Sequence, residues 1–456
     1  MKRVVSIILT LALVMGIVAG CGQSKDAGQS AGKTGTQTTS AEGLDLSNPS
    51  GNLRVISFEP QLEKEHIEIA NKFMEKYPNV KVEYEFPTGN IEEYYQKVDP
   101  MIMAGEPIDI AFTTIIFQYQ KKARDGMYVP IDEYFQKEGK TPEDVYNVDL
   151  RVNGKVYGFP CDAKTFIVFL NKNHLDEAGL SVPPFDWDWN MFRDYAKKLT
   201  KGEGANKRYG TYFHIWPQYL YFPIYSTRLG TPLYVDGKFD ISDPLYADFL
   251  KFRKDMQDVD KSIVPMTEVL STPTSYSQLF FSQKVSMVPA LTSAIADVRK
   301  LDTYPHDFVT VFAPLPRADE NAPVGRRPSE TRFLSIPETS KNVTAAYLFG
   351  RYYSEEGMDI KGAGFSAVKG SSKTETLKVM TQSNESNLYD MKSLEDTMNN
   401  PQIVDNAFDF VPPYLQAVTD ALVQCAQEYL VGGSSLEEAL DKFEKTAKEI
   451  ISREGN

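Results

Sequence analysis

The 456-residue chain has few of the residues on which catalytic and metal sites usually depend. It contains three cysteines and four scattered histidines, which are His66, His174, His214 and His306. It has neither a zinc-binding His-Glu-x-x-His pattern nor a Gly-x-Ser-x-Gly turn for a nucleophilic serine. Its 62 acidic residues make carboxylate pairs easy to find, so no single pair is diagnostic. The sequence therefore shows no catalytic constellation, and we expect no metal and no other cofactor.

The chain also lacks an excess of positive charge. It has 49 Lys and Arg residues and a formal net charge of −13. An acidic protein repels nucleic acid and does not lie flat on anionic lipid, so both kinds of partner are disfavoured. With 42% apolar and 12% aromatic residues, the composition is that of a soluble globular protein. The roughly 400 residues that follow Asn52 exceed a single core, and we expect two lobes.

A long apolar run occurs only at the N-terminus. Lys2 and Arg3 precede an uncharged apolar segment, residues 4–19, which is slightly short for a membrane span. Small residues then lead into Cys21, and this join resembles the lipobox of bacterial lipoproteins, in which the cysteine is lipidated after cleavage. An ordinary signal peptide with a chance cysteine and an N-terminal anchor helix are the alternatives. We expect a signal peptide at residues 1–20 and lipid on Cys21.

The segment after the predicted lipidation site contains almost no large apolar side chains. Residues 22–50 are dominated by Gly, Ser, Thr, Gln and Ala, which cannot offset the entropy of ordering by burial. Residues 21–51 are therefore predicted to tether a folded body to the extracytoplasmic face of the cell membrane. The other two cysteines, Cys161 and Cys425, could pair in an exported protein. They have no spacing signature, however, and we predict two free, packed thiols.

The folded part begins with alternating strand and helix patterns. Short apolar runs at residues 53–58, 80–86 and 108–112 are separated by segments with helical spacing of apolar residues. This alternation predicts an α/β lobe with parallel strands. Ligands of such lobes meet the loops at the carboxyl ends of the strands, here the loops that begin at Phe58, Pro87 and Thr113.

Several stretches resemble one protein family in series. They include VNGKVYGFPCDAKTFIVFLNKNHLDEAGL, PPFDWDWNMFRDYAKKLT, LFFSQKVSMVPA and GGSSLEEALDKFEKTAKEI. From Asn52 onward the chain is similar to the extracellular solute-binding proteins of the maltose-binding type. The resemblance implies a two-lobed α/β fold of the periplasmic-binding-protein type (type II), hinged by crossover strands. It implies a first lobe of residues 52–161 and 333–382 and a second of residues 162–332 and 383–456.

The same resemblance implies a function. A lipid-anchored member would bind an oligosaccharide between its lobes and deliver it to the membrane permease of an ABC importer, and we expect it to act as a monomer. A sugar site needs flat rings for stacking and polar groups for bidentate hydrogen bonds. The segment FHIWPQYLYFPIY supplies the densest ring cluster. Most of its rings are expected in the core, whereas the resemblance places Trp216 and Tyr219 in the cleft.

Other predicted ligand contacts follow the predicted strands or the crossovers between lobes. Ser293 stands where many relatives carry tryptophan, which suggests an unusual ligand. Arg326, Arg327, Glu330 and Arg332 form either a solvated face or a site for a uronate or phosphate group. The full set of predicted contacts is Glu59, Asn90, Thr113, Thr114, Asp162, Lys164, Trp216, Tyr219, Ser293, Arg326, Glu330 and Tyr414.

Three other functions compete with this interpretation. An exported glycoside-active enzyme would need two carboxylates roughly 5 to 10 Å apart. A receptor for a non-sugar solute, such as a phosphorylated polyol or a peptide, would share the fold but not the ligand. A purely structural surface adhesin fits the predicted anchor but not the long alternation of strands and helices.

Overall fold

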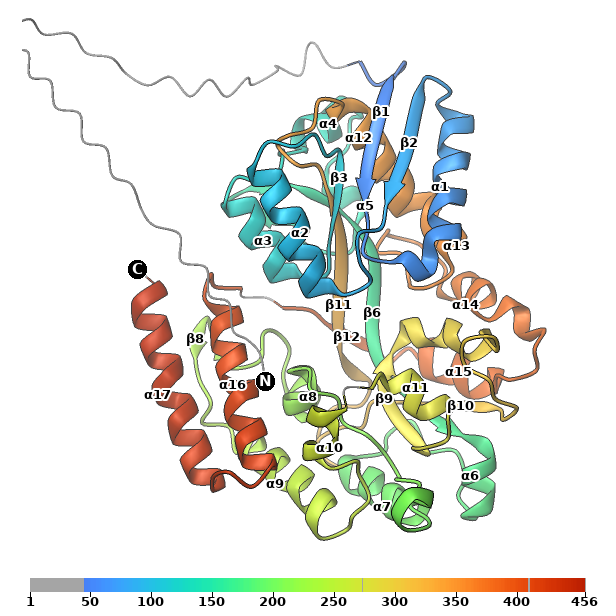
Figure 1. Ribbon diagram of the computed structural model, residues 1–456, viewed down its shortest axis with the longest axis vertical. Coiled ribbons are helices and arrows are strands. Elements are labelled where there is room, and N and C mark those ends of the chain that lie inside the picture. The colour runs from blue at the N-terminus through green and yellow to red at the C-terminus, as the bar shows by residue number, and fades with distance from the viewer. Residues whose placement is uncertain (1–44, 273, 409–410, 456) are drawn as a thin grey trace, which may run out of the picture. The chain divides into compact units, whose positions relative to one another are not determined.

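The computed structural model describes residues 45–272, 274–408 and 411–455 (Figure 1). The predicted signal peptide and lipidation site Cys21 lie outside the described residues. Three strands open the fold, β1 (Gly51–Ile56), β2 (Val80–Glu85) and β3 (Ile110–Thr113), and β1 pairs in parallel with both others. The helices α1 (Glu63–Lys76) and α2 (Ile91–Met103) connect them. The predicted strand–helix alternation with parallel strands is therefore confirmed.

The remaining elements follow in chain order. The helices are α3 (Ile116–Arg124), α4 (Asp132–Lys137), α5 (Pro142–Val145), α6 (Lys172–Glu177), α7 (Trp189–Leu199), α8 (Gln218–Thr227), α9 (Leu245–Asp258), α10 (Met266–Ser271), α11 (Tyr276–Phe281), α12 (Val343–Tyr352), α13 (Met358–Lys361), α14 (Lys373–Thr381), α15 (Met391–Met398), α16 (Leu415–Leu430) and α17 (Leu436–Glu454). The strands are β4 (Arg151–Val152), β5 (Lys155–Val156), β6 (Gly158–Asn171), β7 (Tyr234–Val235), β8 (Lys238–Phe239), β9 (Met287–Leu291), β10 (Thr310–Pro314), β11 (Arg326–Ser335) and β12 (Val404–Asn406).

Two long strands, β6 and β11, connect the two ends of the main sheet. Its order is β10-β6-β11-β3-β1-β2, with β9 also paired to β6 and β12 to β11. The first half of β6 pairs antiparallel with β11, from Gly158 opposite Ser335 to Thr165 opposite Ser329. The second half of β6 pairs with β9 and β10 instead. Figure 1 shows β6 and β11 running from the group of β1, β2 and β3 to the group of β9 and β10.

The buried side chains form three clusters. One surrounds β1, β2 and β3 and contains residues between 53 and 161 and between 333 and 358. The other two lie on opposite faces of β6, because side chains alternate along a strand. Phe166, Val168 and Leu170 enter one cluster with α7, α8, α9, α16 and α17, and Ile167 and Phe169 enter the other with α11. The latter also holds Phe365, Leu377 and Met380.

Local sequence signals explain several elements. Asn90 begins α2 by accepting a hydrogen bond from the amide of Glu93 at 3.0 Å. Asn153 and Gly154 form the turn between β4 and β5 with positive φ angles of 52° and 79°, as a two-residue Asn-Gly hairpin turn requires. Cys161 and Cys425 are both buried and unpaired, which confirms the prediction of two free thiols. Burial raises the pKa of the Cys161 thiol to about 12.

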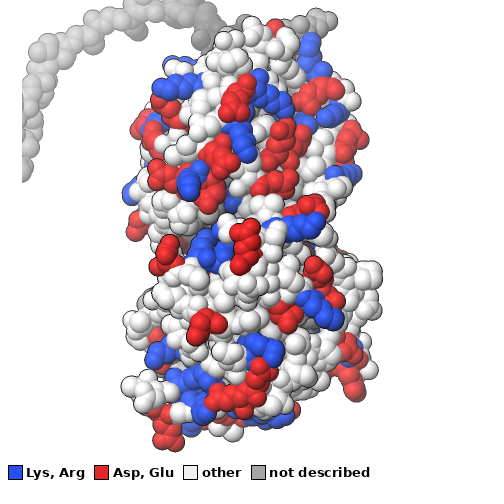
Figure 2. All heavy atoms as spheres, turned by 90° about the vertical axis from the view of Figure 1, so that its right-hand side faces the viewer, with Lys and Arg blue, Asp and Glu red and all other residues white. Residues whose placement is uncertain are grey.

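Two surface properties bear on the predicted partners. Among the described residues, no helix combines the length and apolar character that a membrane crossing requires. Figure 2 shows Lys and Arg interspersed with Asp and Glu on the face it views, so no field of one sign covers that face.

One buried hydroxyl joins two strands of the first cluster. Tyr94 donates to the carbonyl of Ile56 at 2.9 Å and accepts from the amide of Phe112 at 2.9 Å. We expect Tyr94→Phe to lower the free energy of unfolding by about 2–4 kcal/mol, because two buried backbone groups lose their partner. Urea denaturation measures this. The matched control is Tyr195→Phe, which loses a single hydrogen bond to Ser181, and equal losses in the two variants would contradict the assignment.

Candidate ligand-binding site

A cavity of about 570 Å³ lies beside the crossing strands, a volume within the range of small-molecule sites. Its walls come from α3, the segment before β4, α8, β11 and the segment before α16, and α3 and α8 lie to the left of β6 and β11 in Figure 1. The lining residues are Ile115, Ile116, Phe117, Gln120, Asn147, Val148, Asp149, Arg151, Gln218, Tyr225, Pro328, Ser329, Glu330, Thr331, Phe333, Ala407, Phe408 and Val411.

The cavity wall combines aromatic rings with neutral polar groups. Phe117, Tyr225 and Phe408 supply rings, and amides come from Gln120, Asn147 and Gln218. The amide nitrogen of Gln218 donates to Glu330, whereas its buried oxygen has no partner among the described residues. Such an oxygen can accept a hydrogen bond from a ligand hydroxyl.

The cavity's one lining arginine is already engaged. The Nε atom of Arg151 donates to Glu143 at 2.6 Å, and its Nη1 atom donates to Asp132 at 3.1 Å and to the carbonyl of Gly154 at 2.9 Å. Two carboxylates therefore compensate its charge, which leaves less of it for an anionic ligand.

Six charged side chains gather around the paired strands β6 and β11, and we call them the buried charge cluster: Glu59, Asp162, Lys164, Glu330, Arg332 and Lys361. The register of β6 and β11 creates its centre by placing Lys164 opposite Glu330 and Asp162 opposite Arg332. Lys164 Nζ lies 2.8 Å from Asp162 Oδ2. Glu59 enters from the loop after β1, and Lys361 enters from the last residue of α13.

Ion pairs join the cluster across four elements. Arg332 donates to Glu59, and its Nη1 atom lies 3.6 Å from Asp162 Oδ2. Lys361 Nζ lies 2.8 Å from Glu59 Oε2 and 3.4 Å from Asp162 Oδ2. Glu59, Asp162, Lys164 and Lys361 are buried, whereas Glu330 and Arg332 are half-buried. An unpaired charge among the four buried residues would be costly.

The pKa values of the cluster reflect burial and these pairs. Burial alone would raise the pKa of Glu59, but Arg332 and Lys361 outweigh it and hold that pKa well below its usual range. Burial and Arg332 lower the pKa of Lys164 to about 8, although Asp162 opposes the shift. Burial raises the pKa of Glu330. Glu330 is the member of the cluster that also lines the cavity.

The structure brings four of the predicted contacts together, namely Glu59, Asp162, Lys164 and Glu330. Thr114 lies nearby on the loop after β3 and shares a 2.8 Å hydrogen bond with the Tyr95 hydroxyl. Thr113 is fully buried and bonds the Tyr128 hydroxyl at 2.9 Å. Asn90 is exposed and serves as the cap of α2.

The predicted ring contacts differ from each other. Trp216 is 36% exposed and its ring centroid lies 4.4 Å from that of His214. Tyr219 is fully buried, and its hydroxyl donates to the carbonyl of Pro289 at 2.5 Å. Tyr219 therefore has no ring face free for stacking in this conformation, and the ligand contact predicted for it stays a prediction. Ser293 is half-buried in the 3-10 helix Thr292–Arg299 that follows β9, and Tyr414 is half-buried against the cluster that contains Phe166.

The predicted arginine cluster does not converge on one site. Arg326 donates to the carbonyl of Thr227 at 3.1 Å, and Arg327 pairs with Asp405 at 2.7 Å. Arg332 pairs with Glu59 instead. Because neighbouring residues of a strand point to opposite faces, adjacent arginines cannot form one anion site here.

Several residues of the site were not anticipated. Phe117 and Gln120 lie on the first turns of α3, close after Thr114. A helix that directly follows the third strand would have indicated that its first turns lie near the ligand site. Lys361 is separated from Glu59 by 302 positions, and no local pattern connects them. Phe408 lies in a segment without periodic apolar residues.

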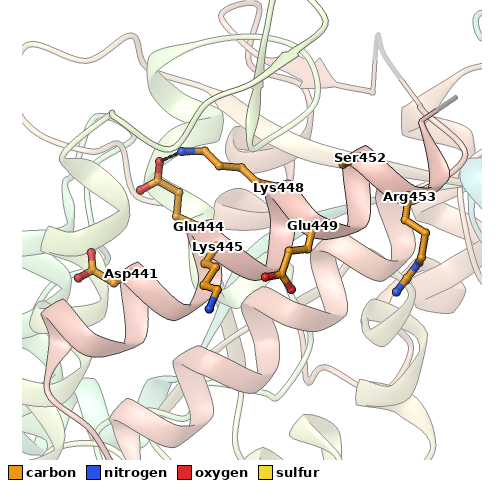
Figure 3. Close-up of a pocket in the computed structure, with 7 residues that line it drawn as sticks. All are labelled: Asp441, Glu444, Lys445, Lys448, Glu449, Ser452 and Arg453. Carbon is orange, nitrogen blue, oxygen red and sulfur yellow. Dashed lines mark hydrogen bonds and ion pairs between the residues drawn. The ribbon is translucent and has the colours of Figure 1, made fainter.

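A second hollow does not resemble a binding site. It has a volume of about 640 Å³ and is lined by seven residues that all belong to α17. Figure 3 shows these side chains along one helix, with Lys448 bonded to Glu444. None of its lining residues comes from an opposing element. Among the described residues, no group of three or more metal-ligating side chains is positioned to hold a metal ion.

Comparisons with known proteins agree with the fold. The sequence model of the family described as bacterial extracellular solute-binding protein matches residues 60–359. A binding protein of Brucella abortus (strain 2308) is 26% identical over 238 residues, which are 50% of this chain and 56% of that protein. The match therefore spans about half the length of this curated relative.

Two solved structures cover almost the whole folded body. A sugar transporter from Rhizobium etli in an open conformation has a TM-score of 0.69 at 21% identity, over 88% of this chain and 99% of that one. UgpB from Mycobacterium tuberculosis in complex with glycerophosphocholine has a TM-score of 0.70 at 17% identity, over 89% and 99%. The predicted α/β fold of the periplasmic-binding-protein type is thereby confirmed.

The lowered pKa of Lys164 predicts a specific pH dependence of stability. Between its folded value of about 8 and its usual value of 10.5, the unfolded state binds more protons, so stability rises with pH. Below this window both states are protonated and the contribution is constant. We expect Lys164→Met to remove a rise on the order of 2 kcal/mol across the window.

Urea denaturation at a series of pH values measures this difference. Lys198→Met is the control because Lys198 is exposed on α7 and is outside the cluster. A difference between the wild type and Lys164→Met that stays constant from pH 8 to 10.5 would contradict the assigned environment.

Proposed function

We propose that this chain, which belongs to the bacterial extracellular solute-binding protein family, is the lipid-anchored receptor of an ABC importer and binds an oligosaccharide beside its crossing strands. The family consists of binding proteins rather than enzymes. The observation that carries the proposal is the cavity, whose wall of rings and neutral amides suits the apolar faces and hydroxyl groups of a sugar.

The charges around the cavity favour an uncharged sugar over a phosphorylated polyol. Arg151 is bonded to two carboxylates, and the basic residues of the buried charge cluster are compensated by its acids. A phosphate group would need an arginine or a lysine without such a partner. Glu330 and Gln218 instead offer hydrogen-bonding groups to a neutral ligand.

The binding movement would be a closure of two lobes. We keep the predicted division into residues 52–161 with 333–382 and residues 162–332 with 383–456, hinged at β6 and β11. The separate buried clusters support it, although Phe365, Leu377 and Met380 pack with the second lobe's core. Phe117 of α3 packs against that core as well, so it spans the proposed cleft. A ligand that contacts both lobes shifts the population toward the closed form.

Attachment and delivery complete the proposal. The sequence around Cys21 supports a lipid anchor on the extracytoplasmic face of the membrane, and the family supports a permease as partner. The closed receptor would present a surface formed by both lobes, which an open receptor does not form. Recognition of that surface would restrict transfer to loaded receptors.

The ring of Phe117 provides the test of the site. We expect Phe117→Ala to weaken the binding of a neutral oligosaccharide by about 1–3 kcal/mol, because a stacking ring is lost. Thermal-shift screening of the chain without residues 1–21 identifies the saccharide, and titration calorimetry measures its dissociation constant.

The matched control is Phe252→Ala, a half-buried ring of α9 that lies outside the cavity. It should reduce stability and leave the dissociation constant unchanged. The sugar assignment would be refuted if phosphorylated polyols or peptides raise the midpoint of thermal unfolding and no saccharide does. A saccharide that is consumed during the assay would refute the receptor assignment.

The anchor has its own test. In the native bacterial host, Cys21→Ser should abolish the incorporation of labelled palmitate and release the protein into the medium, because the sulfur that carries the lipid is absent. Cys425→Ser is the control, since Cys425 is a buried thiol of the folded body. Retention of the label in the Cys21 variant would exclude this lipidation site.

A further inference from the structure

The helix α8 contains a break in its hydrogen-bond pattern. In a regular α-helix, the amide of residue 223 would donate to the carbonyl of Tyr219. Residue 223 is a proline and has no amide hydrogen, so this carbonyl loses its helical partner. Tyr221 correspondingly departs from helical geometry, with φ −137° and ψ 25°. Because Tyr219 is fully buried, water cannot replace the missing donor.

Arg253 supplies the donor from another helix. It belongs to α9, is 1% exposed, and donates from Nη1 to the Tyr219 carbonyl at 2.9 Å. Its guanidinium carbon lies 4.9 Å from the centre of the Phe213 ring. The titratable groups that act on it are Tyr212 and Tyr219, and no carboxylate of the described residues is among them.

Burying an arginine that has no carboxylate partner costs free energy. We therefore expect its guanidinium to make another interaction that stabilises the fold. An apolar side chain would pack as well but would leave the Tyr219 carbonyl unpaired. The position of that carbonyl also matters for the cavity. Gln218 precedes the break and Tyr225 follows it, and both line the cavity. Trp216 lies two residues before Gln218.

We propose that Arg253 is a positioning residue of the ligand site. Its guanidinium replaces the amide that Pro223 lacks, and it thereby fixes the first turn of α8 so that Gln218 reaches Glu330 and Trp216 keeps its place beside His214. The role of these residues toward a ligand rests on the proposed function. The placement of the turn by Arg253 does not depend on it.

A double-mutant cycle between Arg253 and Pro223 tests the inference. Pro223→Ala restores an amide that can bond the Tyr219 carbonyl. Arg253→Met alone should raise the unfolding equilibrium constant about tenfold or more, the cost of one unpaired buried carbonyl. Combined with Pro223→Ala, the same substitution should raise it clearly less. Arg253→Lys, which keeps a donor, should preserve more stability than Arg253→Met.

The fluorescence of Trp216 gives a readout that needs no ligand. The other tryptophans, Trp187 and Trp189, are 1% and 3% exposed, so acrylamide quenching reports mainly on Trp216. Arg253→Met should change the quenching constant, and Pro223→Ala should return it toward the wild-type value. Arg351→Met is the control, since it removes a buried arginine that lies over Phe135 of the first cluster, and it should not affect quenching.

Two results would overturn the inference. One is a loss of stability on Arg253→Met without any change in Trp216 quenching, which would reduce Arg253 to a packing role. The other is that Arg253→Met raises the unfolding equilibrium constant by the same factor in the wild type and in Pro223→Ala. That result would show that the missing amide is irrelevant. Should Arg253→Met fail to fold, the comparison of Arg253→Lys in the two backgrounds decides the same question.

Discussion

The pairing of β6 with β11 is the constraint on which the rest of the molecule depends. This ladder joins the two ends of the sheet, and its register places Asp162 opposite Arg332 and Lys164 opposite Glu330. Buried charges require partners, and the strands alone do not supply enough of them. Glu59 and Lys361 complete the set from the end of β1 and from α13. These ion pairs hold the loop after β1 and the C-terminal end of α13 against the crossing strands.

The same two strands separate two chemical environments. In the buried charge cluster the three basic residues pair with Glu59 and Asp162, whereas the cavity beside it offers rings and neutral amides. Glu330 belongs to both, and Gln218 holds it. A neutral ligand at the proposed site would therefore lie next to strong charges without having to compensate them. The break in α8 at Tyr221 lies between Gln218 and Tyr225, and both of these residues line the cavity.

Much of the fold and part of the site could be predicted from the sequence. Residues that follow a strand, such as Glu59 and Thr114, were predicted as contacts because parallel strands end at one edge of a sheet, and Glu59 does lie in the buried charge cluster. The burial of Tyr219 could not be predicted, because rings stand at so many positions of its segment that their spacing does not distinguish buried rings from rings in the cleft. Lys361 and Arg253 act on residues far away in the chain, and only the folded structure brings them together. The partners of Arg326 and Arg327 are also distant in the sequence, and they could not be predicted for the same reason.

The internal compensation of the charge cluster has a consequence for the medium in which the protein works. Mobile ions screen exposed pairs within about 8 Å at physiological ionic strength, but they do not enter a buried cluster. Glu59, Asp162 and Lys361 are each at most 2% exposed. The attraction among these three residues, which holds α13 and the loop after β1 against β6, should therefore be nearly independent of salinity. An exported protein, unlike a cytoplasmic one, meets surroundings whose salt content the cell does not regulate.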